Sequence, residues 1–213
     1  MNRMEALYGL GCKAVVATAL SLWSAAGAAQ LLGDITQSAL PTATAPTPSG
    51  QAAAVRSTTV GLTSALADTG TLGGADDARN ASLVSGALPG LLAAEVLQAT
   101  TMGWPDQAAS EASLANLGMT LAGIGISADF VMASATAVAG AAGSGGSLVE
   151  NLAVNGASVD VTGAANQVVE IAGGRIVINE QQQSAGGIVV NALHVVVDGV
   201  ADVVVGSASA AIR

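Results

Sequence analysis

The stretch NQVVEIAGGRIVINEQ, residues 166–181, decides the fold. Two runs rich in Val and Ile flank Gly173-Gly174, and apolar side chains alternate with others in both runs. A period of two is typical of a strand buried on one face, and a Gly pair between two such runs predicts a tight hairpin turn. Counting outward from this turn, we expect three cross-strand pairs: Ile171 with Ile176, Val169 with Ile178, and Gln167 with Glu180.

Three further turns flank this hairpin. Asn155-Gly156 lies within SLVENLAVNGASVDVTG (147–163), the loop QQQSAGG spans 181–187, and Asp198-Gly199 precedes the final run ADVVVGSASAAI (201–212). An Asn-Gly or Asp-Gly pair between alternating runs is a strong hairpin signal. We therefore expect about six antiparallel strands after residue 147, with these cross-strand pairs: Val154–Ala157, Leu152–Val159, Glu150–Val161, Asn179–Asn191 and Ile176–His194.

The middle of the chain also predicts strands. LLAAEVLQATTMGW (91–104) and ASEASLANLGMTLAG (109–123) are long enough for helices, but their Thr, Gly and small residues favour strands. Residues 117–143 are apolar over a length that could span a bilayer as a helix, which is the alternative for this segment. Alternation within it favours a strand instead, with a buried face that carries Ile124, Ile126, Ala128, Phe130 and Met132.

The composition indicates the same fold class. Of the 213 residues, 51% are hydrophobic but only 2% are aromatic and 10% charged, and 27 are Gly. A core of Ala, Val, Ile and Leu gains its burial energy through close approach of backbones, which tightly packed sheets provide. We expect an all-β fold, either an antiparallel sandwich or a flattened β-roll, with a C-terminal hairpin meander. The net charge of −9 makes nucleic acid an unfavourable partner.

The first residues predict export. Two basic residues precede an uncharged run, 14–29, that ends in SAAGAAQ. This layout is typical of a secretory signal peptide cleaved near Ala28 or Ala29; an uncleaved anchor, a first strand and a lipoprotein signal at Cys12 are the alternatives. Cleavage would remove the only cysteine, and with it any thiol chemistry. We divide the chain into a signal peptide (1–29), a Pro/Thr/Ala-rich connector or edge segment (30–58) and an all-β surface domain (59–213).

Four polar residues interrupt the apolar runs of 175–197: Asn179, Glu180, Asn191 and His194. A Ser nucleophile with His194 as base and a carboxylate to orient it would give a hydrolase. A zinc site needs three or four ligands, which one histidine and scattered carboxylates do not supply. We interpret the four residues as polar side chains of paired strands, with an Asn179–Asn191 amide pair, His194 bonded through one nitrogen, and Glu180 solvated or paired with Gln. The sequence thus predicts no catalytic, cofactor or metal site.

Two sets of acidic residues make calcium a candidate ligand. Asp198 and Asp202 form one group, and Asp76, Asp77 and Asn80 form the other, in the loop TGTLGGADDARNAS (69–82). Neither group has the ligand spacing of a calcium-binding loop, so turn formation explains both better.

Two other features are candidates for binding sites, one for phosphate and one for sugars. GAAGSGGS (140–147) lacks the Lys and the helix of a phosphate-binding loop, and therefore predicts a linker. Trp104 precedes Pro105 and would contact a sugar ring if it is exposed, or fill the core if it is buried.

Several segments resemble the choice-of-anchor P family of bacterial surface proteins. LVENLAVNGASVDVTGAANQVVEIAGGRIVINEQ (148–181), GIVVNALHVVV (187–197) and GVADVVVGSASAAI (199–212) carry the specific part, and LLAAEVLQATTMG (91–103) and ASLANLGMTLAGIGISADFVMASATA (112–137) also look similar. The resemblance implies a secreted or cell-surface all-β domain, in a family whose members end in different sorting or anchoring tails. No such tail is visible at AAIR (210–213), and Ser209 stands where many relatives carry a second histidine.

We therefore expect an exported bacterial cell-surface or extracellular-matrix protein with a structural or adhesive role, no catalysis and no cofactor. Its expected partner is a second copy of itself, because a strand-rich surface with few charges favours pairing through sheet edges into an oligomer or fibre. The alternative is a monomeric binding module for glycans or a partner protein. A secreted hydrolase centred on His194 is the third class. We expect no transmembrane helix in the mature chain.

Overall fold

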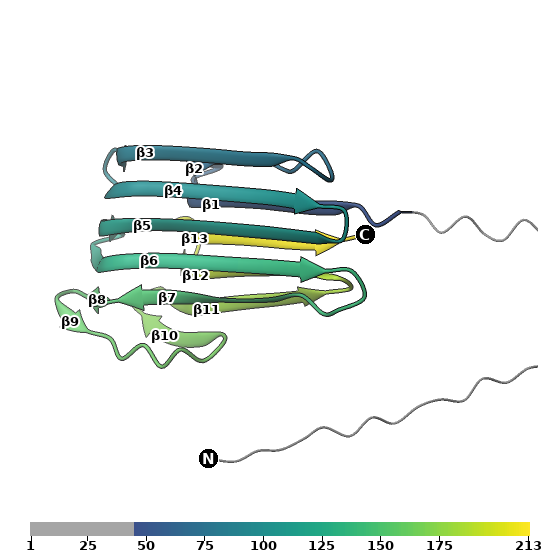
Figure 1. Cartoon of the computed structure of the whole chain (residues 1–213). Helices are drawn as coiled ribbons and strands as arrows, with labels where there is room; N and C mark the ends of the chain where they lie inside the picture. Colours follow the sequence, from purple (N-terminus) through teal and green to yellow (C-terminus); the bar gives the residue numbers. More distant parts are fainter. Residues whose placement is uncertain (1–44) are drawn as a thin grey trace, which may run out of the picture. The chain divides into compact units, whose positions relative to one another are not determined.

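The computed structural model describes residues 45–213, and the regular structure in this range is β-strand throughout. Two antiparallel sheets lie face to face as two layers of nearly straight strands (Figure 1). The expected fold class, an all-β antiparallel sandwich, is confirmed. No helix in this range has the length and hydropathy that a membrane span needs. The expected signal peptide, 1–29, lies outside the described residues.

Sheet A has six strands in the order β10-β11-β12-β13-β1-β2. These are β1 (Pro48–Thr59), β2 (Leu62–Asp68), β10 (Gln167–Ile171), β11 (Gly174–Ser184), β12 (Gly187–Val197) and β13 (Ala201–Ile212). The C-terminal hairpins thus form one end of the sheet, and β1 pairs with both β13 and β2. The expected connector or edge segment is therefore wrong for residues 48–58, which form an inner strand. Four consecutive residues of this strand, 52–55, are fully buried, which hides the alternation that would have revealed it.

Sheet B has the order β3-β4-β5-β6-β8-β9, and β7 also pairs with β6. Its strands are β3 (Ala78–Leu88), β4 (Leu92–Trp104), β5 (Gln107–Leu121), β6 (Ile124–Val138), β7 (Ser144–Glu150), β8 (Ala153–Val154) and β9 (Ala157–Ser158). The strands expected in 91–104 and 109–123 are confirmed as β4 and β5. The expected loop 69–82 ends at residue 77, because β3 begins at Ala78.

The Asn155-Gly156 hairpin forms as expected, but it is short. Val154 lies opposite Ala157, and the Val159 N–H donates to the Leu152 carbonyl over 2.8 Å. The third expected pair is wrong, because Glu150 belongs to β7 and lies opposite Phe130 of β6.

The hairpin of residues 166–181 has a register shifted by two from the expected one. Its turn is Ala172-Gly173, so Ile171 lies opposite Gly174. Val169 therefore faces Ile176 and not Ile178, and Gln167 faces Ile178 and not Glu180. A shift of two residues keeps each side chain on the same face of the sheet, so the predicted apolar face survives the wrong pairing.

The next hairpin differs from the prediction by a single residue. Its glutamines belong to β11, and the turn is Ala185-Gly186. Glu180 therefore lies opposite Asn191, and His194 lies opposite Val177, where Asn179 and Ile176 were the expected partners. The expected turn at Asp198-Gly199 is present, and it places Val197 opposite Ala201.

A row of backbone bends crosses each sheet at the middle of its strands. Residues with left-handed backbone angles recur there, with φ between 47° and 67°. Ladder pairing continues on both sides of the row, but the residues within it are missing from the ladders. We call it the bend row; it comprises Ala54, Ala67, Asn179, Ala192 and Gly206 in sheet A, and Val84, Val96, Asn116, Asp129 and Asn151 in sheet B.

The bend row reverses which side chains are buried. In β6, Ile124, Ile126 and Ala128 are buried before the row, and Val131 and Ala133 are buried after it. The expected buried face is therefore wrong beyond Ala128, since Phe130 and Met132 are partly exposed.

The bend row also separates two parts of the core. Large side chains fill one part: Leu92, Leu117, Met119, Leu121, Ile124, Ile126, Leu193, Val195 and Val203. The other part is rich in alanine: Ala99, Ala108, Ala112, Ala133, Ala135, Ala137, Ala208 and Ala210. In this second part the sheets approach closely, because a Cβ on Gly50 would lie 2.7 Å from Thr101 Oγ1 and 2.8 Å from Ser110 Oγ.

Candidate functional site

A polar cluster lies around His194 on the outer face of sheet A. Its neighbours Leu193 and Val195 are fully buried between the sheets, so strand alternation directs His194 outward. β11 contributes Glu180, β12 contributes Asn191 and His194, and β13 contributes Asp202 and Ser207. We call these five residues the His194 cluster.

Each ring nitrogen of His194 faces a carboxylate. Nδ1 lies 2.9 Å from Glu180 Oε2, and Nε2 lies 3.0 Å from Asp202 Oδ1. The side chains of His194 and Glu180 are 19% and 17% exposed, against 56% for Asp202. The geometry thus gives each ring nitrogen a carboxylate neighbour, where the sequence predicted a hydrogen bond through one nitrogen.

The remaining members extend this network across the bend row. Asn191 Nδ2 donates to Glu180 Oε2 over 2.6 Å, and Ser207 Oγ donates to Asn191 Oδ1 over 2.8 Å. An activated serine nucleophile needs a hydrogen bond to its base. Here Ser207 donates to Asn191, while both nitrogens of His194 face carboxylates. The geometry is that of a hydrogen-bonded cluster of polar side chains.

Asn179 does not pair with Asn191 as expected. Its backbone is left-handed, with φ 52°, and its Nδ2 donates to the Gly163 carbonyl over 3.0 Å. Its Oδ1 accepts from Gln181 Nε2 over 3.0 Å. The side chain therefore ties the segment before β10 to β11.

A second charged pair, Arg56 and Asp68, lies on the same outer face. Val204 lies opposite both His194 and Arg56, so it separates the pair from the His194 cluster. Arg56 Nε lies 3.2 Å from Asp68 Oδ2. Among residues 45–213, Arg56 Nη2 is a buried donor without a partner.

The environment of Asp68 favours its charged form. Partial burial alone would raise its pKa, but other effects outweigh it. Gln51 Nε2 and the Gly70 N–H donate to Oδ1 over 2.9 and 2.8 Å, and Arg56 adds a positive charge, so the pKa of Asp68 lies below its usual value. The sequence did not indicate this pair, because Gln51 and Arg56 lie in the segment that its composition predicts to be a connector.

The two acidic groups considered for calcium do not converge. Asp202 binds His194, and Asp198 lies in the β12–β13 turn. Asp77 Oδ2 accepts from the Gly73 N–H over 2.7 Å and from Arg79 Nε over 2.9 Å, and these contacts lower the pKa of Asp77. Asn80 Nδ2 donates to Thr100 Oγ1 across β3 and β4. Nowhere in the described range do three His, Cys, Asp or Glu side chains converge as metal ligands.

The other two segments singled out in the sequence are parts of the framework. The predicted linker 140–147 consists of a turn and the first four residues of β7. Trp104 is the last residue of β4 and is 41% exposed. It is thus not a core residue.

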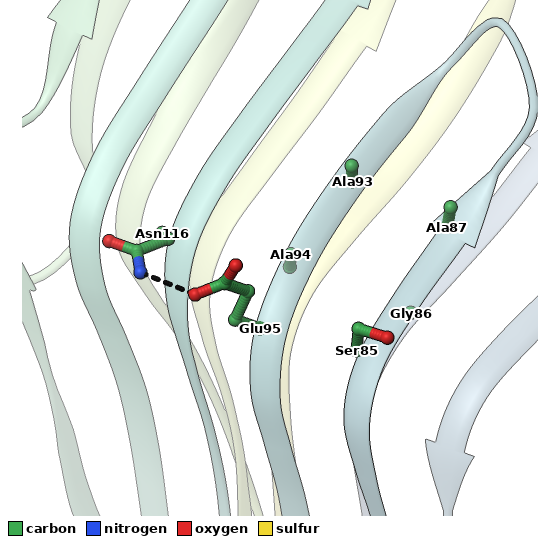
Figure 2. Close-up of a pocket in the computed structure, with 7 residues that line it drawn as sticks. All are labelled: Ser85, Gly86, Ala87, Ala93, Ala94, Glu95 and Asn116. Atoms are coloured by element: carbon green, nitrogen blue, oxygen red, sulfur yellow. Dashed lines mark hydrogen bonds between the residues drawn. The ribbon is translucent and has the colours of Figure 1, made fainter.

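A hollow of about 280 Å³ lies at the bend row of sheet B, lined by Ser85, Gly86, Ala87, Ala93, Ala94, Glu95 and Asn116. Figure 2 shows the Glu95 and Asn116 side chains pointing toward each other, with only small side chains elsewhere in the lining. Asn116 Nδ2 donates to Glu95 Oε2 over 2.8 Å. The only charged group of this hollow is therefore already paired.

The chain matches no family model, and neither a curated protein nor a solved structure is significantly similar to it. The structure itself defines the class, an antiparallel β-sandwich with a hydrogen-bonded cluster of polar side chains on one outer face.

Proposed function

We propose that this chain is an exported bacterial cell-surface or extracellular-matrix protein with a structural or adhesive, non-catalytic role. One observation carries the proposal: the polar groups of the His194 cluster are bonded to one another across three strands, in an arrangement that braces the sheet. The close approach of the sheets in the alanine-rich part of the core supports a rigid framework. The resemblance of residues 148–212 to choice-of-anchor P proteins supports the location outside the cell.

Export is tested with the full chain carrying a C-terminal tag in a bacterial host. We expect the tagged protein outside the cytoplasm, with an N-terminus directly after Ala28 or Ala29 by mass spectrometry. The control is Leu20→Arg, which places a charge in the uncharged run and is expected to retain the chain inside. An unprocessed wild-type chain in the cytoplasm would contradict the proposal.

The half-exposed Trp104 supports a second candidate, a binding module for glycans. Aromatic rings at a surface offer a flat apolar face with a polar edge, which suits sugars. A glycan panel read by calorimetry tests it, with Trp104→Ala as the variant. Binding that disappears in this variant would favour the binding module over the structural role.

A further inference from the structure

On one lateral side of the sandwich, glutamine side chains of β11 contact backbone carbonyls at the start of β7. β7 pairs with β6 along one edge, and β11 side chains reach toward its other edge. Gln183 Nε2 donates to the Gly143 carbonyl over 3.0 Å, and Gln181 Nε2 donates to the Gly145 carbonyl over 3.4 Å. These amides occupy carbonyls that an incoming strand would need.

The opposite side of the molecule leaves a long strand edge open. β3 and β2 lie together on that side (Figure 1), and β3 pairs only with β4. β3 has eleven residues and contains neither Pro nor Lys, the residues that commonly block edge pairing. Its one charged residue, Arg79, is paired with Asp77. The free backbone groups of β3 are therefore open to another extended strand.

Where the bend row reaches the β3 edge of sheet B, its side chains are apolar and exposed. Elsewhere in sheet B, Asn116 of β5 and Asn151, which follows β7, lie in the row and donate to acidic side chains. At the edge the row contains Val84, which is 88% exposed, and Val96, which is 55% exposed. Leu83 beside them is 40% exposed. An apolar patch thus adjoins the unpaired backbone of β3.

We propose that β3 pairs in antiparallel orientation with β3 of a second copy of this chain, so that sheet B continues across a two-fold dimer. A second copy fits best because it offers an extended strand of the same length, with the same apolar patch and the same low charge. Because a two-fold pairing uses the β3 edge of both copies, the arrangement is complete at a dimer. This inference rests on the structural role in the proposed function, and it specifies the surface through which two copies would associate.

The test is sedimentation velocity on the exported wild-type chain over a concentration series, together with Val84→Lys. The matched control is Val168→Lys, which places the same charge on an exposed valine of β10, the edge strand at the other end of sheet A. We expect a dimer for the wild type and for the control. Val84→Lys should raise the dissociation constant at least about tenfold, because two like charges would meet at the interface.

Amide hydrogen exchange supplies a second readout in the wild-type chain. Protection in residues 78–88 should increase with protein concentration, while protection in 167–171 should not change. A wild type that stays monomeric overturns the dimer, and a dimer that Val84→Lys leaves intact overturns β3 as its interface. If the chain is exported but monomeric, the dimer is wrong while the proposed location outside the cell still holds. Failure of the dimer is therefore distinguishable from failure of the proposed function.

Discussion

Asn116 holds a left-handed backbone, with φ 50°, and donates from its side chain to Glu95 of the neighbouring strand over 2.8 Å. Asn151 repeats this relationship with Asp129 over 2.7 Å. Asn is among the few residues with a Cβ that adopt this conformation readily, because its short polar side chain bonds locally. In sheet B, a hydrogen bond from the Asn to an acidic side chain of the neighbouring strand therefore stabilises each of these two bends.

Two substitutions of Asn116 should separate what its hydrogen bond and its left-handed backbone angle each contribute to the free energy of unfolding. Asn116→Ala removes the hydrogen bond and places Ala in a left-handed conformation, so we expect a loss of about 1–2 kcal/mol in the free energy of unfolding. Asn116→Gly removes the same hydrogen bond but adopts the backbone angle freely, and should cost less. Urea unfolding of both variants measures the difference. If both variants lose the same free energy of unfolding, the left-handed backbone angle contributes nothing to the cost of Asn116→Ala.

Gly206 is a confined position of the bend row in sheet A. Its φ is 67°, and an added Cβ would lie 3.1 Å from Ala192 Cβ and 3.3 Å from Val131 Cγ1. Gly206→Ala should therefore lower the free energy of unfolding by about 2 kcal/mol or more. Gly118→Ala is the control, since no atom lies within 4 Å of its added Cβ and its φ is not positive. We expect it to change stability by less than about 0.5 kcal/mol, and thermal unfolding of both variants provides the comparison.

The sequence predicted the fold class because its signals are local. Alternation and Gly-containing turns identify single hairpins, and a two-residue error at Ala172-Gly173 left every side chain on its expected face. The single-residue error at Ala185-Gly186 was more serious, because it replaced the Glu180–Asn191 pair with Asn179–Asn191. Nothing in the glutamine run itself distinguishes a loop from a strand whose side chains bind another sheet.

The bend row and β1 depend on contacts that are distant in sequence. Phe130 continues the alternation of Ile124 and Ile126, and only the row of bends on neighbouring strands shows that the pattern reverses there. β1 pairs with β13, more than 140 residues later, at Ala53 and Ser207. Its Pro- and Thr-rich surroundings concealed a strand whose small residues are required where the sheets approach each other.

Asp68 should make stability depend on pH in the acidic range. Its pKa is lowered in the folded state, so the stability that it contributes is present above its unfolded pKa and is lost as pH falls through the folded value. Asp68→Asn should therefore be less stable than the wild type near pH 7, and the difference should shrink below about pH 4. Denaturant unfolding at pH 7, 5 and 3 measures it. A difference that stays constant over this range would assign the effect to Gln51 packing and not to charge.

His194 and Glu180 should be energetically coupled. Their contact is 2.9 Å long and partly buried, so a double-mutant cycle with His194→Ala and Glu180→Ala should give a coupling of about 1 kcal/mol. A cycle of His194→Ala with Glu150→Ala, on the other sheet, should give about zero within 0.3 kcal/mol.

The same His194→Ala protein tests the hydrolase alternative on a panel of esters, peptides and glycosides. If the wild type hydrolyses a substrate and the folded variant does so more than about tenfold more slowly, His194 is a general base and the structural role is wrong. Coupling without such a loss assigns the His194 cluster to bracing strands β11, β12 and β13.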